Sequence, residues 1–513
     1  MLSSGLLTII LVSLVVSEQR QAFKAAVYEH DVILPEPRAT EFSRQEAIAI
    51  TMKNLVVFNQ QAMVAAQESV EIMVFPQGGL YGMGFDRRNI TPFLEAVPMV
   101  TKDLWNPCTQ STKHASTKIQ FELSCIARNN SLFVVANLAS KAMCDGEDDD
   151  YKDENCPEDG FYIYNTVVVF DNNGNLIAKY NQFNIPHNSV FDYPHMSEMV
   201  TFDTPFGIFG VLMCNDLNQF DPAVRMIEEM GISNFVCSGS SSDNPPSYVT
   251  IREQAGFARG YGVNLLAANV HKPLMNKVGS GIFTPDRQTR FYYDNRQGSD
   301  GRLVIATART LRKPLRHNIP EYTTKLQSKG PSPDTFVTKV NGIPYTMSRL
   351  DKPQGTFKLC HSEICCELEY KISLRGGDEY VFAIQNGYIH GGNKYLFSQS
   401  CIIIRCVNST EEECGIPQNS AHSYFTHLRI KGYFSTKHVY PQFLVNNRGQ
   451  LDVAPVRFHY SDGVLWSRQV TFPLESAGFI GRIFSRDGVN SASSASFSLF
   501  LLFVSLCSLL FIM

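Results

Sequence analysis

Cys214 is the residue whose surroundings best fit covalent chemistry. It ends the apolar run GIFGVLMC (207–214) and precedes a polar turn that leads to Asp221 and Pro222, where a helix is expected to begin. Backbone N–H groups at a strand-to-helix turn lower the pKa of a thiol and can hold an oxyanion. The position therefore suits a thiolate that attacks a carbonyl. A buried core cysteine or a disulfide partner is the structural alternative.

A second turn carries an amide where such chemistry usually has a carboxylate. The apolar run EIMVF (71–75) stops at Pro76 and turns through Gly78 and Gly79, with Gln77 at the start of the turn. Glutamine has no useful basicity, so Gln77 cannot act as a general base. The acidic stretch DGEDDDYKDEN (145–155) fits no calcium-loop spacing and is interpreted as a solvated loop. We predict neither a metal nor a cofactor.

The elements that must position these turns differ between two parts of the chain. Over residues 24–310, apolar strand-like runs alternate with helical patterns, which is typical of a layered α/β domain. One long helix is expected after Ser43, because Ser43 and Glu46 have the spacing of a capping box. Over residues 311–486 the pattern becomes short strands separated by turns. We therefore predict a second, smaller β domain, rich in disulfides.

Both ends of the chain predict an extracellular protein. Residues 1–17 form a short apolar segment that ends at small residues, as in a cleaved signal peptide; an uncleaved anchor is the alternative. Residues 487–513 place small residues before a hydrophobic tail with no basic flank, which fits a GPI-attachment signal rather than a transmembrane helix. We expect a lipid-anchored protein on the extracellular face of the cell membrane. A secreted form of the same protein is the alternative.

The cysteines and the charge agree with this location. Of 13 cysteines, Cys108 with Cys125 and Cys144 with Cys156 are expected to form local bridges. Six more in the last third are expected to crosslink the β domain: Cys360, Cys365, Cys366, Cys401, Cys406 and Cys414. Glycosylation sequons begin at Asn89, Asn129 and Asn408. The net charge of -4, without a basic block, argues against nucleic acid as a partner.

Several segments together resemble one known family. They are AAVYEHDVIL (25–34), YNTVVVFD (164–171), FGIFGVLMCNDLNQFDPA (206–223), NLLAANVH (264–271), GSGI (279–282), CHSEICCELEY (360–370) and CIIIRC (401–406). Over about residues 24–480 the chain resembles the vanin and biotinidase family of the nitrilase superfamily. The resemblance implies an αββα sandwich domain, a β-rich base domain, and hydrolysis of a linear amide such as that of pantetheine or biocytin.

In that family a glutamate acts as general base, a lysine stabilises the tetrahedral intermediate and a cysteine is the nucleophile. The resemblance places the cysteine at Cys214, the glutamate at Gln77 and the lysine at Gln182. Lys179 is near in sequence, but three positions earlier in a strand it should face the other side. The family's His-Lys pair and a loop glutamate are also missing from residues 180–195. A shift of the alignment by a few residues would move the lysine position away from Gln182.

The paired loss of an anion and a cation leads to an expectation about stability and activity. Replacing both by amides leaves the local charge sum unchanged, and the two neutral side chains could hydrogen-bond each other. We therefore favour a catalytically impaired member of the family that binds a small amide ligand, pantetheine-like or a biotin amide. The alternative is a working amidohydrolase in which Cys214 is assisted by substitute acid and base groups.

Overall fold

The structure is a computed structural model. It describes residues 21–34, 41–114, 116–144, 154–186, 189–244, 249–286, 288–315, 319–322, 335–374, 376–391, 394–406, 414–415, 420–453 and 457–489. The expected signal peptide, the hydrophobic tail after residue 489, Asn408 and residues 145–153 of the acidic loop lie outside these ranges. Among the described residues, no helix is both long and apolar enough to cross a lipid bilayer.

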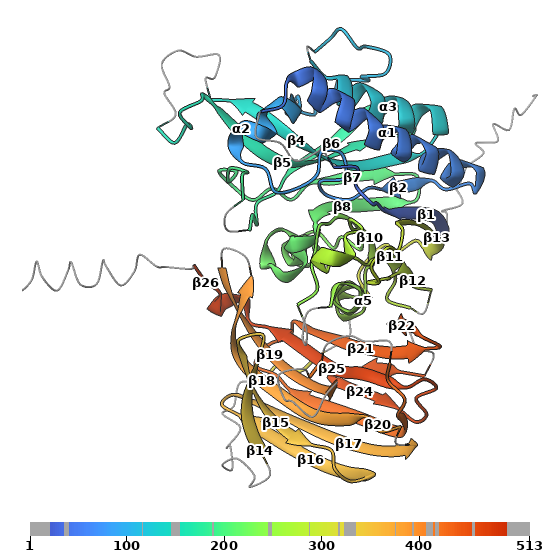
Figure 1. The fold of residues 1–513 in the computed structure, drawn as a ribbon, viewed down its shortest axis with the longest axis vertical. Helices are drawn as coiled ribbons and strands as arrows, with labels where there is room; N and C mark the ends of the chain where they lie inside the picture. Colours follow the sequence, from blue (N-terminus) through green and yellow to red (C-terminus); the bar gives the residue numbers. More distant parts are fainter. Residues whose placement is uncertain are drawn as a thin grey trace, which may run out of the picture.

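Two stacked sheets form the centre of the first domain (Figure 1). The order of the first is β13-β1-β2-β4-β5-β6, with the short β3 beside β4, and that of the second is β12-β11-β10-β9-β8-β7. The first sheet comprises β1 (Ala22–Glu29), β2 (Ile72–Val74), β3 (Glu95–Ala96), β4 (Phe133–Met143), β5 (Phe161–Phe170), β6 (Leu176–Asn181) and β13 (Arg302–Arg309). The second comprises β7 (Thr201–Thr204), β8 (Gly207–Met213), β9 (Asn234–Ser238), β10 (Asn264–Ala268), β11 (Ser280–Phe283) and β12 (Arg290–Tyr292).

Helices cover the outer faces of both sheets, which completes the predicted αββα arrangement. On the first sheet lie α1 (Arg44–Gln67) and α3 (Lys118–Asn130), with the short α2 (Arg87–Ile90) nearby, as Figure 1 shows. On the second lie α4 (Arg225–Glu229) and α5 (Thr250–Tyr261). The predicted capping box is present, because Ser43 and Glu46 bond each other's backbone N–H at the start of α1.

The second domain consists of two antiparallel sheets packed face to face. The larger comprises β14 (Thr335–Val340), β15 (Ile343–Arg349), β18 (Glu379–Gly391), β19 (Lys394–Cys406), β21 (Val439–Asn447), β22 (Gln450–Asp452), β25 (Leu474–Arg482) and β26 (Gly488–Val489). The smaller comprises β16 (Gln354–His361), β17 (Ile364–Leu374), β20 (Tyr424–Tyr433), β23 (His459–Ser461) and β24 (Val464–Ser467). Apolar side chains of both sheets share one core.

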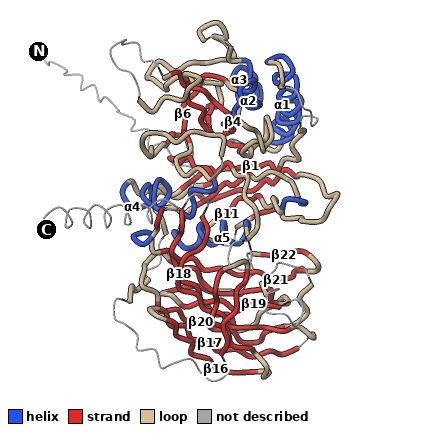
Figure 2. The backbone as a smooth tube through the Cα atoms, turned by 60° about the vertical axis from the view of Figure 1, so that its left-hand side comes forward, coloured by secondary structure: helices blue, strands red, loops and turns tan. Residues whose placement is uncertain are grey.

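Helix α5 joins the two domains, and it lies between the first domain's sheets and the larger sheet of the second in Figures 1 and 2. Its contact with β21 depends on two glycines. A Cβ atom added to Gly260 would lie 2.9 Å from the carbonyl oxygen of Val439, and one on Gly256 would lie 3.2 Å from that of Pro441. The helix therefore packs directly against the backbone of β21.

Two disulfides match the pairings expected from local spacing. Cys108 pairs with Cys125, and Cys144 pairs with Cys156. The six cysteines of the second domain form the bridges 360–365, 366–401 and 406–414, all inside that domain. A sixth bridge, described below, involves Cys214.

Candidate active site

Gln77 and Cys214 lie at the same edge of the two central sheets. Gln77 follows β2, and its backbone N–H donates to the carbonyl oxygen of Gly239 at 3.1 Å. Gly239 directly follows β9 and packs against Cys214: a Cβ atom added to it would lie 2.8 Å from the Cys214 sulfur. The fold thus brings together two positions that are 137 residues apart, as the resemblance requires.

Gln182 lies just after β6, and its side chain is 1% exposed. Its Oε1 accepts a hydrogen bond from Asn165 Nδ2 at 2.7 Å, and its Nε2 donates to the backbone oxygen of Asn184 at 3.0 Å. Both functional atoms of the amide are therefore occupied by these neighbours. Gln182 does not use these atoms for the direct hydrogen bond that the two glutamines could form, because they bond Asn165 and Asn184 instead.

A chain of buried amides connects Gln182 to the turn that carries Gln77. Asn165 Oδ1 accepts from Asn137 Nδ2 at 2.7 Å, and Asn137 Oδ1 accepts from the backbone N–H of Gly78 at 2.7 Å. Asn137 and Asn165 lie on β4 and β5 and are at most 1% exposed. We call Asn137, Asn165 and Gln182 the amide chain. Sequence reasoning missed its first two members, although an asparagine inside each apolar strand was the available signal.

The far end of the site holds one buried carboxylate. Asp216 accepts hydrogen bonds from Asn184 Nδ2 (2.8 Å), the Tyr180 hydroxyl (2.8 Å) and the backbone N–H of Met213 (2.9 Å). Burial raises the pKa of Asp216 to about 6, although these hydrogen bonds oppose the rise. Both carboxylate oxygens are already bonded within the protein, so Asp216 cannot replace the missing base without losing these contacts.

Cys214 is bonded to Cys237 rather than present as a free thiol. Leu212 of β8 lies opposite Cys237 of β9 in parallel register, which leaves the Cα atoms of the two cysteines 5.2 Å apart, within disulfide range. Cys214 is only 4% exposed. A thiolate cannot form while this bond is intact, so the disulfide alternative describes the structure and the expected free nucleophile does not.

Lys179 does not supply the missing ammonium group. Its Nζ donates to the carbonyl oxygen of Val97 at 2.8 Å. Val97 belongs to the core between the first sheet and its outer helices, whereas Tyr180 belongs to the core between the two sheets. Lys179 therefore faces away from the site, as its place in the strand predicted. Burial lowers the pKa of Lys179.

The second domain holds the turn that begins at Cys214. This turn, η2 (Cys214–Asn218), ends at Asn218. The Asn218 carbonyl oxygen accepts hydrogen bonds from Arg482 of β25, from Nε at 3.2 Å and from Nη2 at 3.1 Å. Arg482 is fully buried and also pairs with Asp487 at 2.6 Å. On the other side, the Asn218 amide donates to Glu253 of α5, whose pKa burial raises to about 7. The turn is thus fixed from both domains.

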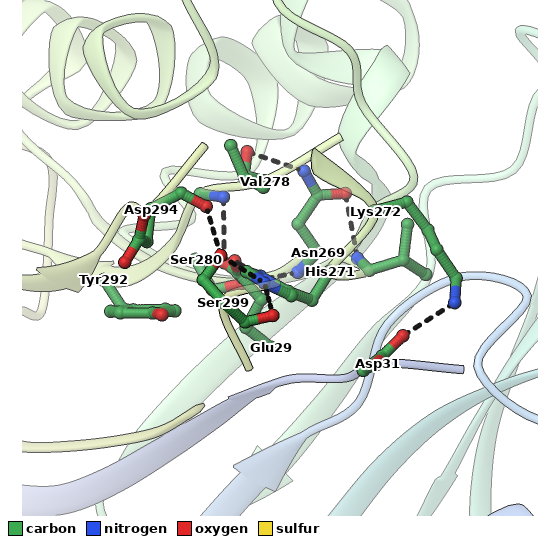
Figure 3. A network of polar contacts seen from close by, with 12 residues as sticks. Glu29, Asp31, Asn269, His271, Lys272, Val278, Ser280, Tyr292, Asp294 and Ser299 are labelled. Atoms are coloured by element: carbon green, nitrogen blue, oxygen red, sulfur yellow. Dashed lines mark hydrogen bonds and ion pairs between the residues drawn. The ribbon is translucent and has the colours of Figure 1, made fainter. Parts of the chain in front are cut away.

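A separate polar network beside the site contains the groups most similar to an acid–base set (Figure 3). His271 Nδ1 lies 2.8 Å from Glu29 Oε1, and His271 Nε2 lies 2.9 Å from the carbonyl oxygen of Ser299. A carbonyl oxygen can only accept, so Nε2 carries a proton, and Nδ1 shares a hydrogen bond with the Glu29 carboxyl group, whose pKa burial raises. Glu29 also accepts from Gly279 and Ser280. Both ring nitrogens of His271 are therefore occupied by these partners, and it is not a free base.

This network predicts a pH dependence of stability. Burial lowers the pKa of His271, but the hydrogen bond and charge of Glu29, with the Ser299 carbonyl, raise it overall. The stabilisation is fully present below the ordinary pKa of about 6.5 and is lost as the pH rises through the higher folded-state pKa. In denaturation experiments, the stability difference between the unaltered protein and His271→Gln should shrink between pH 6 and pH 9. A constant difference would contradict a charged His271.

Comparison with known proteins agrees with both domains. Residues 38–254 match the carbon-nitrogen hydrolase family, and residues 334–487 match the vanin C-terminal domain. Pantetheinase of Mus musculus is 35% identical over 92% of this chain and 91% of its own length. Pantetheinase of Homo sapiens is 32% identical over 93% and 91%, and biotinidase of Mus musculus is 31% identical over 91% and 95%.

Among solved structures, an amidase from Nesterenkonia sp. aligns with 56% of this chain and 91% of its own, at 15% identity and a TM-score of 0.37. The sequence relatives cover nearly the whole chain and include both of its domains. The chain therefore belongs to the vanin family of carbon–nitrogen hydrolases, together with the pantetheinases and biotinidases.

Proposed function

We propose that this protein is a catalytically impaired vanin that binds a small linear amide without hydrolysing it at the family's rate. The observation that carries the proposal is the amide chain. It occupies the region between the Gln77 turn and Asn184 with neutral, mutually bonded side chains. Removing a positioned general base typically costs about 100- to 10,000-fold in rate, and removing an oxyanion donor costs about 100- to 1,000-fold.

The disulfide adds a second, independent obstacle to turnover. The nucleophile of this mechanism is a thiolate, and Cys214 is bonded to Cys237. Reduction alone would not restore the family's mechanism, because Gln77 cannot take the proton from the thiol. The rate losses from the missing base and from the missing oxyanion donor are not expected to multiply, since the effects of groups that act as a unit are non-additive.

Retention of ligand binding can be tested with an amide that has no thiol, so that it cannot exchange with the disulfide. We expect isothermal titration of the purified full-length protein with an N-alkyl pantothenamide to show saturable binding and recovery of the intact amide. Gln77→Trp should block binding at the half-buried turn, whereas Gln67→Trp, at the exposed end of α1, should not. Equal binding by both variants would place the ligand elsewhere, and absence of binding would contradict the proposal.

We also propose that the protein is carried on the extracellular face of the cell membrane by a lipid anchor. The support is the sequence of residues 487–513, in which a stretch of small residues precedes a hydrophobic tail. Phosphatidylinositol-specific phospholipase C should therefore release the protein from intact cells. If a known GPI-anchored protein is released in the same sample while this protein stays bound, a membrane-spanning tail replaces the proposal.

A further inference from the structure

One lysine at the site has only neutral partners. Lys277 Nζ donates to the Ser240 hydroxyl at 3.2 Å and also to the Ser240 carbonyl oxygen. Within the described residues, no carboxylate forms an ion pair with it, and burial is the cause that lowers its pKa. Lys272, five residues earlier, differs because it pairs with Asp31 at 2.6 Å. Lys277 is thus a half-buried cation without a counter-ion in the described part of the protein.

The partner of Lys277 belongs to the wall of the site. Ser240 follows Gly239, which bonds the backbone of Gln77 and packs against the Cys214 sulfur. The Ser240 hydroxyl also contacts the Met83 sulfur at 2.7 Å, so the 239–240 segment reaches the loop that follows Gln77. Asn269 fixes the next residue, because its Oδ1 accepts from the Ser241 N–H at 2.9 Å. Lys277 is therefore anchored to a positioned segment rather than to a free surface.

The carboxylates near this segment are already bonded within the protein: Asp243 accepts from Thr250 and Tyr293, and Glu29 accepts from Gly279 and Ser280. The groups at the segment itself favour an anion. Gln77 and Gln182 are neutral, and Cys214 is neutral in its disulfide. Asp216 is negative when ionised, but it is fully buried and its oxygens are bonded by three donors. The Gln77 side chain is half-buried and forms no hydrogen bond to the rest of the described chain, so its Nε2 is available as a donor. An ammonium group and an amide N–H both favour a carboxylate over a neutral amide.

We propose that this site prefers a carboxylic acid, of the kind that hydrolysis of a linear amide releases, with Lys277 as counter-ion and Gln77 as hydrogen-bond donor. The proposal rests on the proposed function, because it assigns the ligand class of the same site. A glutamate at position 77 would repel such an acid. The change to glutamine that removes the base thereby also removes the repulsion, and the protein becomes suited to retain the acid rather than to produce it.

The test compares each acid with its neutral amide: pantothenate with N-propyl pantothenamide, and biotin with biotin methylamide. With full-length protein at pH 7.4, we expect at least one acid to bind about tenfold more tightly than its amide, as a charge-assisted hydrogen bond allows. Lys277→Met should abolish this preference and Lys277→Arg should retain it. Lys272→Met is the matched control and should behave like the unaltered protein. Gln77→Glu should weaken binding of the acid more than that of the amide.

The outcomes separate this inference from the function on which it rests. Amide binding that equals or exceeds acid binding, with no effect of Lys277→Met, overturns the acid preference and leaves the amide-binding function intact. Absence of binding for all four compounds overturns both. Melting temperatures of the Lys277 variants show whether a loss of acid binding arises from unfolding. Lys277→Arg then shows whether the acid preference requires a positive charge at position 277.

Discussion

A variant that combines Gln77→Glu, Gln182→Lys and Cys237→Ala is expected to hydrolyse a linear amide at least about 100-fold faster than the unaltered protein. Each change restores one missing requirement: a carboxylate as base, an ammonium group for the oxyanion, and a free Cys214 thiol. Recovery should be partial, because the loop glutamate of the family is also absent from residues 180–195. Initial rates of pantetheine hydrolysis, measured by release of the amine, check this expectation.

Two controls make the result interpretable. The same variant with Cys214→Ala added should return to background, since the nucleophile is then removed. The variant without Cys237→Ala should stay at background until its disulfide is reduced. A folded combined variant with no gain in rate would mean that positions 77, 182 and 214 do not form one catalytic unit.

Gln182→Lys alone is expected to lower the free energy of unfolding by about 3–5 kcal/mol, the usual cost of leaving a charge buried without its partner. Gln182 is 1% exposed, and Asn165 Nδ2 would lose the oxygen that accepts its hydrogen bond at 2.7 Å. Adding Gln77→Glu should recover part of this loss, with a coupling of about 0.5–3 kcal/mol. Denaturant unfolding of the unaltered protein, of Gln182→Lys, of Gln77→Glu and of the double variant measures both the destabilisation and the coupling.

Gln77→Ala serves as the control for this series, because Gln77 is half-buried and its side chain has no hydrogen bond to other described residues. It should change stability by no more than about 0.5 kcal/mol. A cost below about 1 kcal/mol for Gln182→Lys would show that the ammonium reaches water, and the amide chain would then not be sealed. Strict additivity would show that residues 77 and 182 do not interact.

Local patterns in the sequence were sufficient for much of the fold. The capping box at Ser43 fixed the start of α1, because its two hydrogen bonds involve residues three positions apart. Alternation of strands and helices predicted a layered α/β domain, the family resemblance implied its αββα arrangement, and short spacing led to the 108–125 and 144–156 bridges. In each case the determining contacts are short-range or follow from a regular period.

The features that escaped prediction depend on pairing between distant elements. Cys237 becomes the partner of Cys214 because β8 and β9 are parallel neighbours, which their sequences do not specify. Asn137 and Asn165 each interrupt an apolar strand, but only the register of β4, β5 and β6 turns them into one hydrogen-bonded chain with Gln182. The positions of Gln77 and Cys214 came from the family resemblance, and the structure explains how they meet through Gly239.

The most direct test of catalytic impairment is the turnover of pantetheine and of a biotin amide by the purified protein, with mouse pantetheinase as positive control. The Cys237→Ala variant belongs in the same assay, because it frees Cys214 without reducing the other disulfides. We predict background rates for the unaltered protein and for Cys237→Ala, since neither has a base at position 77. Turnover by either protein that approaches the control rate and is abolished by Cys214→Ala would contradict the account.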